Sequence, residues 1–488
     1  MISAIYMFPI PGGDAIAFVP AAVSYSAGNG LKNIIYLLSF ITDVQHQGRF
    51  SHYPPLFPWL VGALMPHHTV QAAFFILGLF SLISIGIFTF LLLKIVKLYR
   101  SYINYDSAIV VSLMIFSYSS LILPMSGRPE LLAAIFVLSG AAIFAFGKGE
   151  VSAILLGVSL GFLGATHIAA AIISTVILLL GYSYRYRSKK VIQLFLISTL
   201  VALAITVTLI AVSPNGFVDT LVGINLTAKM QLERTDTGLF MILNYWVFSV
   251  SSFFFGPIII FSFLSFVYRS FQTYRDNGTT TIYWICLLSL AYLFYFFGFR
   301  AAPISYNFTL FQPIAYCMLL LGLFQNKSSK SGDKLMRQDK RKIAYKNIVL
   351  LMLLISLVSP LRTSFLFVDY VASGKTYENA RNQAKAILSG GKHMLFTGNM
   401  WTLSDEYEKM SPWDITVRNH SGNPEVEVIL LQQEAGTSHF APENGTLVAD
   451  WRYFKQPLIF GIPLGNRPQG YSFSAWAIAN SGKSNSGK

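Results

Sequence analysis

The sequence predicts a polytopic α-helical membrane protein, with about 10–12 transmembrane helices and a small α/β domain near its C-terminal end. Three observations lead to this fold class. Hydrophobic residues make up 54% of the 488 residues and charged residues only 12%, about half the charged fraction of a soluble domain. Apolar runs of roughly twenty residues, enough to cross a hydrocarbon core of about 30 Å, recur along the chain. From about residue 370 onwards these runs stop.

The expected spans, in chain order, lie at 69–96, 106–124, 129–147, 151–164, 166–184, 191–213, 243–268, 280–298, 301–323 and 347–366. The segment 54–65 begins with a double proline, which cannot continue an upstream helix but can start a downstream one. We expect it to be a re-entrant helix that leads into the span from 69. The pair 151–164 and 166–184 is separated by a short break before His167, which fits two short spans or one broken helix.

The formal net charge of +14 is distributed as membrane topology demands. Lysine and arginine gather in alternate loops, at 94–100, 148, 185–190, 269–275 and 327–346. By the positive-inside rule these loops are cytoplasmic, and nucleic acid is not an expected partner. The opposite, extracytoplasmic face then carries 1–68, 125–130, the break at His167, 214–242, the turn at Arg300 and the chain after 366.

The chain divides into four expected parts. These are a first outer loop with the re-entrant helix (1–68), a multi-span domain (69–366), an extracytoplasmic soluble domain (367–479) and a disordered tail (480–488). The stretch before Asp14 is too short to cross a membrane, so we expect a preceding span to be missing. In the soluble part, 376–388 has helical composition, whereas 393–397, 425–431 and 471–479 are typical of strands.

The first candidate residue is Asp14, which follows Pro11-Gly12-Gly13, a loop in which backbone can approach a ligand closely. A carboxylate in a partly desolvated cleft can act as a general base and take a proton from an attacking hydroxyl. Aspartate after glycine is also a common turn residue, so Asp14 alone does not establish a site.

Two further candidates, His52 and Tyr53, directly precede the double proline. Histidine can ligate a divalent metal or contact a phosphate, and tyrosine can hydrogen-bond there. The alternative is an interfacial aromatic belt, to which Tyr53 would belong in any case.

Candidates deeper in the chain are Arg128, Glu130, His167 and Arg300. Glu130 suits the start of a helix, where a carboxylate complements the dipole, and Arg128 can pair with it or hold an anion. His167 lies at the same expected level, although a histidine in an apolar region is often a satisfied core residue. Arg300 can hold a phosphate or extend to lipid headgroups. The loop 214–242 is expected to be a lid or a helix on the membrane surface.

Several function classes are disfavoured by what the sequence lacks. It has no Walker or HExxH motif. Most spans carry no ionisable residue in their middle, whereas ion-coupled transporters usually need one. The two cysteines, Cys286 and Cys317, lie in apolar spans and are expected to be core residues. The ionisable residues instead collect at one membrane face, which favours chemistry on a lipid-linked substrate.

Four motifs in order resemble the membrane glycosyltransferases of the C-type fold, in the branch of protein O-mannosyltransferases and lipid A aminoarabinose transferases. They are Pro-Gly-Gly-Asp14, His52-Tyr53-Pro54-Pro55-Leu56-Phe57-Pro58-Trp59-Leu60, Gly127-Arg128-Pro129-Glu130-Leu131-Leu132 and Leu160-Gly161-Phe162-Leu163-Gly164-Ala165-Thr166-His167. The similarity is best from about residue 10 to 185. The chain departs from the family at Ala15, where relatives often carry a second acidic residue.

The resemblance implies transfer of a sugar from a polyprenyl-phosphate carrier to a glycan, lipid or protein acceptor at the extracytoplasmic face. The short loops and modest length of the chain favour a bacterial inner membrane. It implies that Asp14 is the base, that His52 and Tyr53 contribute to metal or carrier-phosphate binding, and that Arg128 and Glu130 form the family's Arg-Pro-acidic stretch. A divalent metal at His52 is left open. The alternatives are a transporter or flippase of lipid-linked sugars and an envelope-assembly scaffold.

Overall fold

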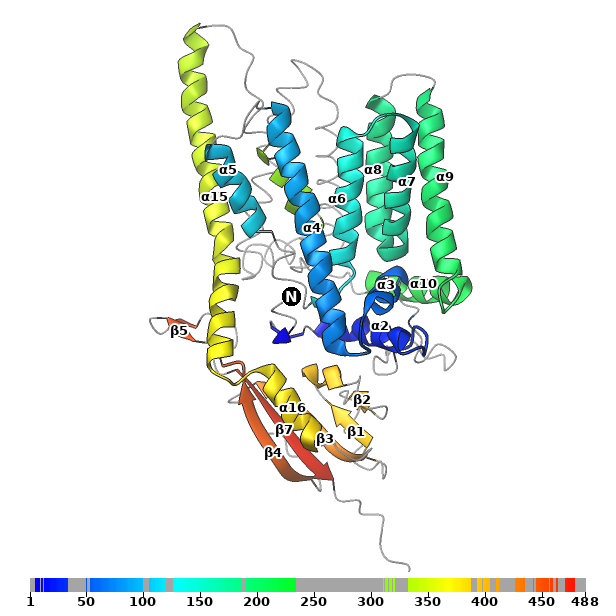
Figure 1. Ribbon diagram of the computed structural model, residues 1–488, viewed down its shortest axis with the longest axis vertical. Helices are drawn as coiled ribbons and strands as arrows, with labels where there is room; N and C mark the ends of the chain where they lie inside the picture. Colours follow the sequence, from blue (N-terminus) through cyan, green and yellow to red (C-terminus); the bar gives the residue numbers. More distant parts are fainter. Residues whose placement is uncertain are drawn as a thin grey trace, which may run out of the picture.

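The protein is described by a computed structural model whose helices run along its long axis, with a small β-sheet at one end (Figure 1). The described residues are 5–8, 10–11, 13–33, 50, 53–99, 105–118, 126–185, 190–233, parts of 310–320, 332–387, 393–396, 398–403, 410–412, 426–434, 442, 445–455, 457–459, 462–463 and 470–478. The expected spans 243–268 and 280–298 therefore lie outside the described part of the chain.

The long helices are α4 (Val70–Tyr99), α5 (Tyr105–Phe116), α6 (Glu130–Phe146), α7 (Gly149–Thr166), α8 (Ile168–Arg185), α9 (Lys190–Ala211) and α15 (Gly332–Ala372). They coincide with predicted spans, except that α5 ends at Phe116, well before the predicted end at 124, and α7 and α8 are two separate helices. Only α15 begins much earlier than predicted, because its first turns are charged and hydropathy detects only the apolar remainder. Within the described residues, Val70–Lys97, Gly149–Thr166 and Ile192–Ala211 are long and apolar enough to cross a membrane.

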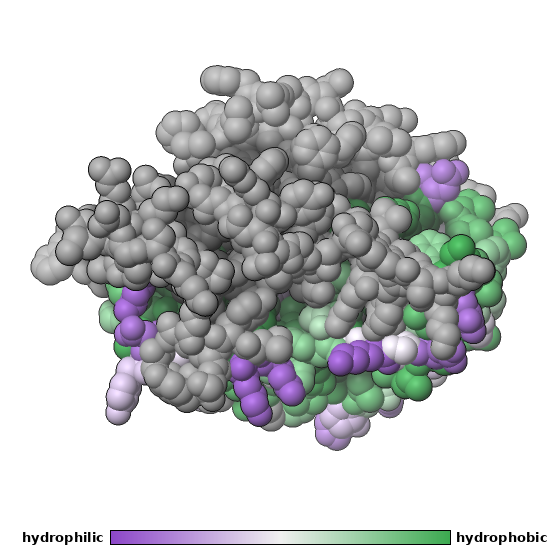
Figure 2. Space-filling view, turned by 90° about the horizontal axis from the view of Figure 1, so that it is seen from above, coloured by the Kyte–Doolittle hydropathy of each residue, from purple (hydrophilic) through white to green (hydrophobic). Residues whose placement is uncertain are grey.

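The surfaces of these helices match a lipid environment. On α9, the exposed side chains include a stripe of leucine and valine at helical spacing, namely Leu196, Leu200, Leu203 and Val207. Figure 2, which views the end opposite the sheet, shows a mainly hydrophobic described surface interrupted by separate hydrophilic groups. Burying such a stripe in hydrocarbon avoids the cost of exposing it to water. The prediction of a helical membrane protein is therefore confirmed.

Helices α7 and α9 pack through small residues. A Cβ atom on Gly157 would lie 2.6 Å from the backbone oxygen of Ser198, and one on Gly161 would lie 2.7 Å from Cβ of Ile205. The close approach also allows side-chain hydrogen bonds across the contact, including Ser198 Oγ to the oxygen of Ala153 at 2.6 Å. Small residues at helical spacing are the usual means by which membrane helices approach closely.

We expect Gly157→Ala to lower the melting temperature, because the added methyl must push α9 away and overpacking costs about 1–3 kcal/mol. The matched control is Gly86→Ala on α4, where a Cβ meets nothing within 4 Å. There alanine should be neutral or stabilising by up to about 1 kcal/mol, since it favours the helix. Thermal unfolding of both purified variants tests the pair, and equal melting temperatures would contradict the packing argument.

The C-terminal part forms a five-stranded sheet in the order β2-β1-β3-β7-β4. Its strands are β1 (His393–Phe396), β2 (Met410–Pro412), β3 (Val426–Glu434), β4 (Gly445–Tyr453) and β7 (Tyr471–Ile478), with a short hairpin of β5 (Leu458–Ile459) and β6 (Ile462–Pro463). β1 is parallel to β2 and β3, whereas β7 is antiparallel to β3 and β4. Helix α16 (Tyr377–Ile387) packs on β4 and β7.

Short elements lie between the long helices and the sheet (Figure 1). They are the 3-10 helix η1 (Gly13–Ala17), helices α2 (Val19–Ser26), α3 (Leu56–Leu64) and α10 (Phe217–Glu233), and the 3-10 helix η7 (Gly398–Leu403). One hydrophobic core joins residues of η1, α2 and α4 to residues of α16, η7 and the sheet. We call this region the site end of the bundle.

Helix α10 falls within the loop predicted to be a lid or a surface helix. Its first two turns expose Phe217, Val218, Leu221 and Val222, which share one face. The lipid-exposed stripe of α9 directly precedes this helix in the chain. An apolar face beside a lipid-facing helix favours the surface-helix interpretation.

Candidate functional site

Helix η1 carries Asp14 and is held against the turn that precedes α6. Gly127 has φ of +62°, and a Cβ built there would lie 2.5 Å from Cβ of Ala15. Only glycine combines this backbone conformation with so close a contact. Ala15 is fully buried as a result. The residue after Gly127 is Arg128, so the chain places the Asp14 helix and the Arg128 turn side by side.

Asn33 fixes the other end of η1. Its side-chain amide is buried and donates hydrogen bonds to the backbone oxygens of Ile16, at 2.7 Å, and Ala17, at 3.1 Å. Carbonyls at the end of a helix lack partners within the helix. Asn33 therefore satisfies two of these groups and ties η1 to the loop that follows α2.

Phe18, between η1 and α2, is the point where the proline step and the Arg128 turn meet. Its ring lies 5.0 Å from that of Tyr53 in an edge-on contact and 5.8 Å from that of Phe57. The guanidinium carbon of Arg128 lies 5.8 Å from the same ring. A cation over an aromatic face is attracted by the ring quadrupole, so Phe18 helps to orient Arg128.

Arg128 and Glu130 form a buried ion pair. Nη2 of Arg128 lies 2.9 Å from Oε1 of Glu130, and Nε donates to both carboxylate oxygens at 3.2 and 3.1 Å. The two side chains are only 8% and 2% exposed. Taking both charges out of water costs free energy. Only a pair with hydrogen-bond geometry of this quality offsets that cost. Because Glu130 is the first residue of α6, the helix dipole favours its charge as well.

His167 lies in the break between α7 and α8 and is buried. Its Nδ1 accepts a hydrogen bond from the backbone nitrogen of Ala170 at 3.3 Å. This contact orients the imidazole ring at the start of α8. His167 also interacts electrostatically with Glu130, so the histidine and the ion pair belong to the same group of residues.

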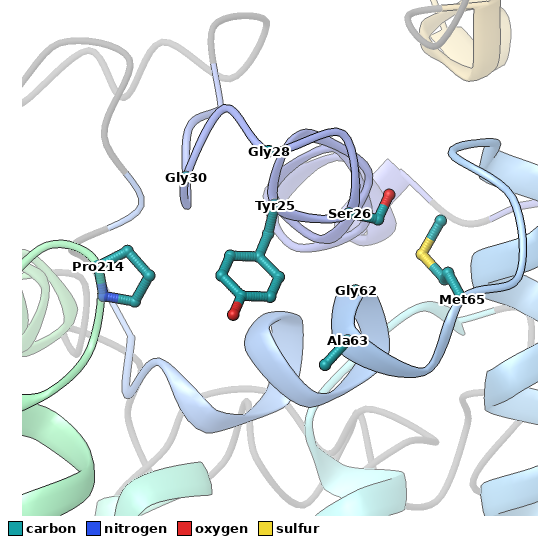
Figure 3. Close-up of a pocket in the computed structure, with 8 residues that line it drawn as sticks. All are labelled: Tyr25, Ser26, Gly28, Gly30, Gly62, Ala63, Met65 and Pro214. Atoms are coloured by element: carbon teal, nitrogen blue, oxygen red, sulfur yellow. The ribbon is translucent and has the colours of Figure 1, made fainter.

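A cavity of about 450 Å³ opens at the far end of α2, about 10 Å along the helix from Phe18. Figure 3 shows the ring of Tyr25 pointing into it, between Gly62 on α3 and Pro214 at the end of α9. The Tyr25 hydroxyl accepts a hydrogen bond from Nε1 of Trp59 at 2.7 Å. Because the Tyr25 oxygen accepts this bond, its own proton points away from Trp59. The cavity therefore has a polar group in a fixed position beside its apolar walls.

The structure thus groups much of the predicted site. The backbone of Asp14 and the side chains of Tyr53, Arg128, Glu130 and His167 all lie at the site end. His52 and Arg300 lie outside the described residues. No group of three His, Cys, Asp or Glu side chains among the described residues can hold a metal.

Sequence reasoning missed Phe18 and Asn33. A buried asparagine in a loop has no periodic signal, and one phenylalanine among the 40 in the chain carries no mark of its contacts. Their roles follow only from the fold, which brings residues 16–18, 33, 53 and 128 together.

Comparison with known proteins gives similarity in structure alone. No protein-family model and no curated protein matches the sequence. Two crystal structures of ArnT from Cupriavidus metallidurans are similar over nearly the whole chain. The form bound to undecaprenyl phosphate has a TM-score of 0.54 at 12% identity and covers 98% of this chain and 96% of its own. The apo form has a TM-score of 0.55 at 11% identity, with 98% and 95% covered.

A third structure, the Archaeoglobus fulgidus oligosaccharyltransferase in complex with Zn and sulfate, reaches a TM-score of 0.48 at 11% identity and covers 86% of this chain and 64% of its own. That score is too low to support an argument. The ArnT comparison, together with the apolar helices, is sufficient for the architecture. The chain has the fold of the ArnT structures, the C-type membrane glycosyltransferase fold that its sequence motifs predict.

Proposed function

We propose that the protein is an integral-membrane glycosyltransferase that moves a sugar from a polyprenyl-phosphate carrier to an acceptor hydroxyl. The observation that carries the proposal is the position of η1, with Asp14, against the buried Arg128–Glu130 pair. Displacement at a sugar phosphate requires a base for the acceptor hydroxyl and a cation for the leaving phosphate. In support of such a carrier, the similar ArnT structure has undecaprenyl phosphate bound.

The reaction is a single inverting displacement. Asp14 takes the proton of the acceptor hydroxyl, whose oxygen attacks the anomeric carbon. The bond between that carbon and the phosphate oxygen breaks, and the polyprenyl phosphate leaves with the bonding electrons. Negative charge grows on the phosphate, and Arg128 stabilises it while Glu130 keeps the guanidinium in place. Tyr53 and His167 are proposed to line the site, and further contacts to the phosphate are assigned to His52 and Arg300.

A divalent metal near His52 would supply additional charge at the phosphate. No step of the proposed reaction depends on it, because each step is assigned to a residue of the chain. The proposed location is a bacterial inner membrane, with the site end and the sheet domain on the extracytoplasmic side. This orientation follows from the lysine and arginine loops. The proposed partners are the lipid-linked donor, a glycan, lipid or protein acceptor, and membrane lipid.

The test is sugar transfer in membranes that contain the protein, using a panel of radiolabelled polyprenyl-phosphate monosaccharides. We expect label in a new glycosidic product, and separation of that product into protein, lipid and glycan fractions identifies the acceptor class. The transporter alternative predicts that label crosses the membrane without a new bond. An envelope-assembly scaffold predicts neither a new glycosidic bond nor movement of label across the membrane. No transfer from any donor, by protein that binds the carrier, would overturn the proposal.

A further inference from the structure

The segment leading to Asp14 is anchored by aromatic side chains from the opposite end of the sequence. The ring of Phe8 lies 5.3 Å from that of Phe367, 5.1 Å from that of Tyr370 and 5.7 Å from that of Phe454. The first two belong to the last turns of α15, and Phe454 directly follows β4. Aromatic pairs at these separations add about 0.5–1.5 kcal/mol beyond the burial of their area.

One hydroxyl connects three parts of the molecule within this cluster. Oη of Tyr370 donates a hydrogen bond to the backbone oxygen of Tyr6 at 3.1 Å. The same oxygen accepts a hydrogen bond from the backbone nitrogen of Tyr377, the first residue of α16. Tyr370 therefore joins the end of α15, the start of the sheet domain and the segment before Asp14.

The backbone is unusual at this junction. Met7 has φ of +48° and Phe454 has φ of +57°, and they are the non-glycine residues of the described part with positive φ. One precedes Phe8 and the other packs against it. Such conformations cost on the order of 1–3 kcal/mol each and persist only where the surroundings fix them. The contacts around Tyr370 are therefore strong enough to hold two unfavourable residues in place.

A second route from the sheet domain ends on η1 itself. Helix η7 packs against η1. The side chain of Arg381 holds η7 by donating to the backbone oxygen of Thr402 from Nε, at 3.2 Å, and from Nη2, at 3.0 Å. The hydroxyls of Tyr377 and Thr402 share a hydrogen bond at 2.6 Å. Tyr377 thus takes part in both routes, through its nitrogen to Tyr370 and through its hydroxyl to η7.

We infer that Tyr370 is a positioning residue whose hydroxyl couples the sheet domain to the segment before Asp14 and so sets the place of η1 against the Arg128 turn. The inference rests on the proposed function in one respect: the proposed function makes Asp14 the base, which gives its placement a purpose. It makes the sheet domain a working part of the site and not a separate binding module.

The test compares two tyrosines of the same cluster. Tyr370→Phe keeps the ring and removes both hydrogen bonds. Tyr453→Phe is the matched control, because its hydroxyl is buried and has no hydrogen-bond partner among the described residues. Burial raises the pKa of Tyr453 well above its ordinary value, so the control removes a neutral, unpaired group. Losing such a group should not destabilise the protein.

Two measurements are made on both variants. Hydrogen exchange of the backbone amides of residues 13–17 should become about tenfold faster in Tyr370→Phe, as expected for the loss of a buried hydrogen bond. The kcat of sugar transfer should fall about tenfold with KM unchanged, because the base is misplaced while the substrates still bind. Tyr453→Phe should match the wild type in both measurements.

The outcomes separate the inference from the proposed function. Wild-type exchange and kcat in Tyr370→Phe would overturn the role of Tyr370, and so would equal losses in Tyr453→Phe, which would indicate general loosening. Full activity in Asp14→Asn would overturn the role of Asp14. In that case exchange at residues 13–17 would still decide whether Tyr370 holds η1.

Discussion

Sugar transfer by Asp14→Asn is expected to fall by about 10²–10⁴-fold, the usual contribution of a general base. Asparagine has nearly the same size as aspartate, but its amide does not accept a proton at neutral pH. Because η1 is held by its backbone and by Ala15, the substitution should leave the fold and the binding of the carrier unchanged. Transfer of labelled sugar is measured beside carrier binding in the same membranes.

The control for this experiment is Asp106→Asn at the opposite end of the bundle. Asp106 pairs with Lys346 at 2.7 Å, with both side chains about half exposed. Exposed pairs contribute little to stability, so this variant should retain wild-type transfer. Equal activity in Asp14→Asn and wild type would remove Asp14 from the mechanism and leave the acceptor hydroxyl without an assigned base.

Arg128→Met is expected to cause the largest loss of stability. Glu130 would remain buried. It would lose the hydrogen bonds that Arg128 donates to its carboxylate in the described structure. Breaking a buried pair from one side typically costs about 3–5 kcal/mol, since it leaves an uncompensated charge. Thermal unfolding of the purified variant should show a clearly lowered melting temperature.

A double variant separates the structural role of Arg128 from its role in the reaction. Arg128→Met with Glu130→Leu replaces the whole pair by apolar side chains, which is often neutral for stability. The melting temperature should therefore recover. Sugar transfer should remain low, because the cation that stabilises the leaving phosphate is gone. Recovery of activity along with stability would show that the pair only supports the fold.

The helices were the predictable part of this fold. A span must bury an apolar run whatever its neighbours are, and α4, α6 and α9 match the predicted limits closely. In the C-terminal part, β1, β3 and β7 were predicted, but β2 and β4 were not. Along β4 most side chains between Gly445 and Arg452 are partly or fully exposed, so its pattern lacks the apolar alternation that identifies a strand.

The candidate site was predicted as a set of residues but not as an arrangement. Gly127, Arg128 and Glu130 are neighbours in sequence, and their motif marked them. The contact of Gly127 with Ala15 and that of Tyr370 with Tyr6 join positions far apart in the chain. Such contacts depend on helix packing and on the path of the chain after α15, which no local pattern encodes. The roles predicted for the candidate residues stay predictions, namely those of Asp14, His52, Tyr53, Arg128, Glu130, His167 and Arg300.

The mixing of early and late residues in one core has a consequence for biosynthesis. Ribosomes add roughly 5–20 residues per second, so η7 emerges on the order of tens of seconds after η1. Throughout this interval the membrane helices can insert, while the segment around Phe8 waits without its partners. A chain whose translation stops early would leave an inserted bundle with an unfinished site. On the proposed function, only a molecule whose last strands have folded can therefore begin to use a lipid-linked sugar.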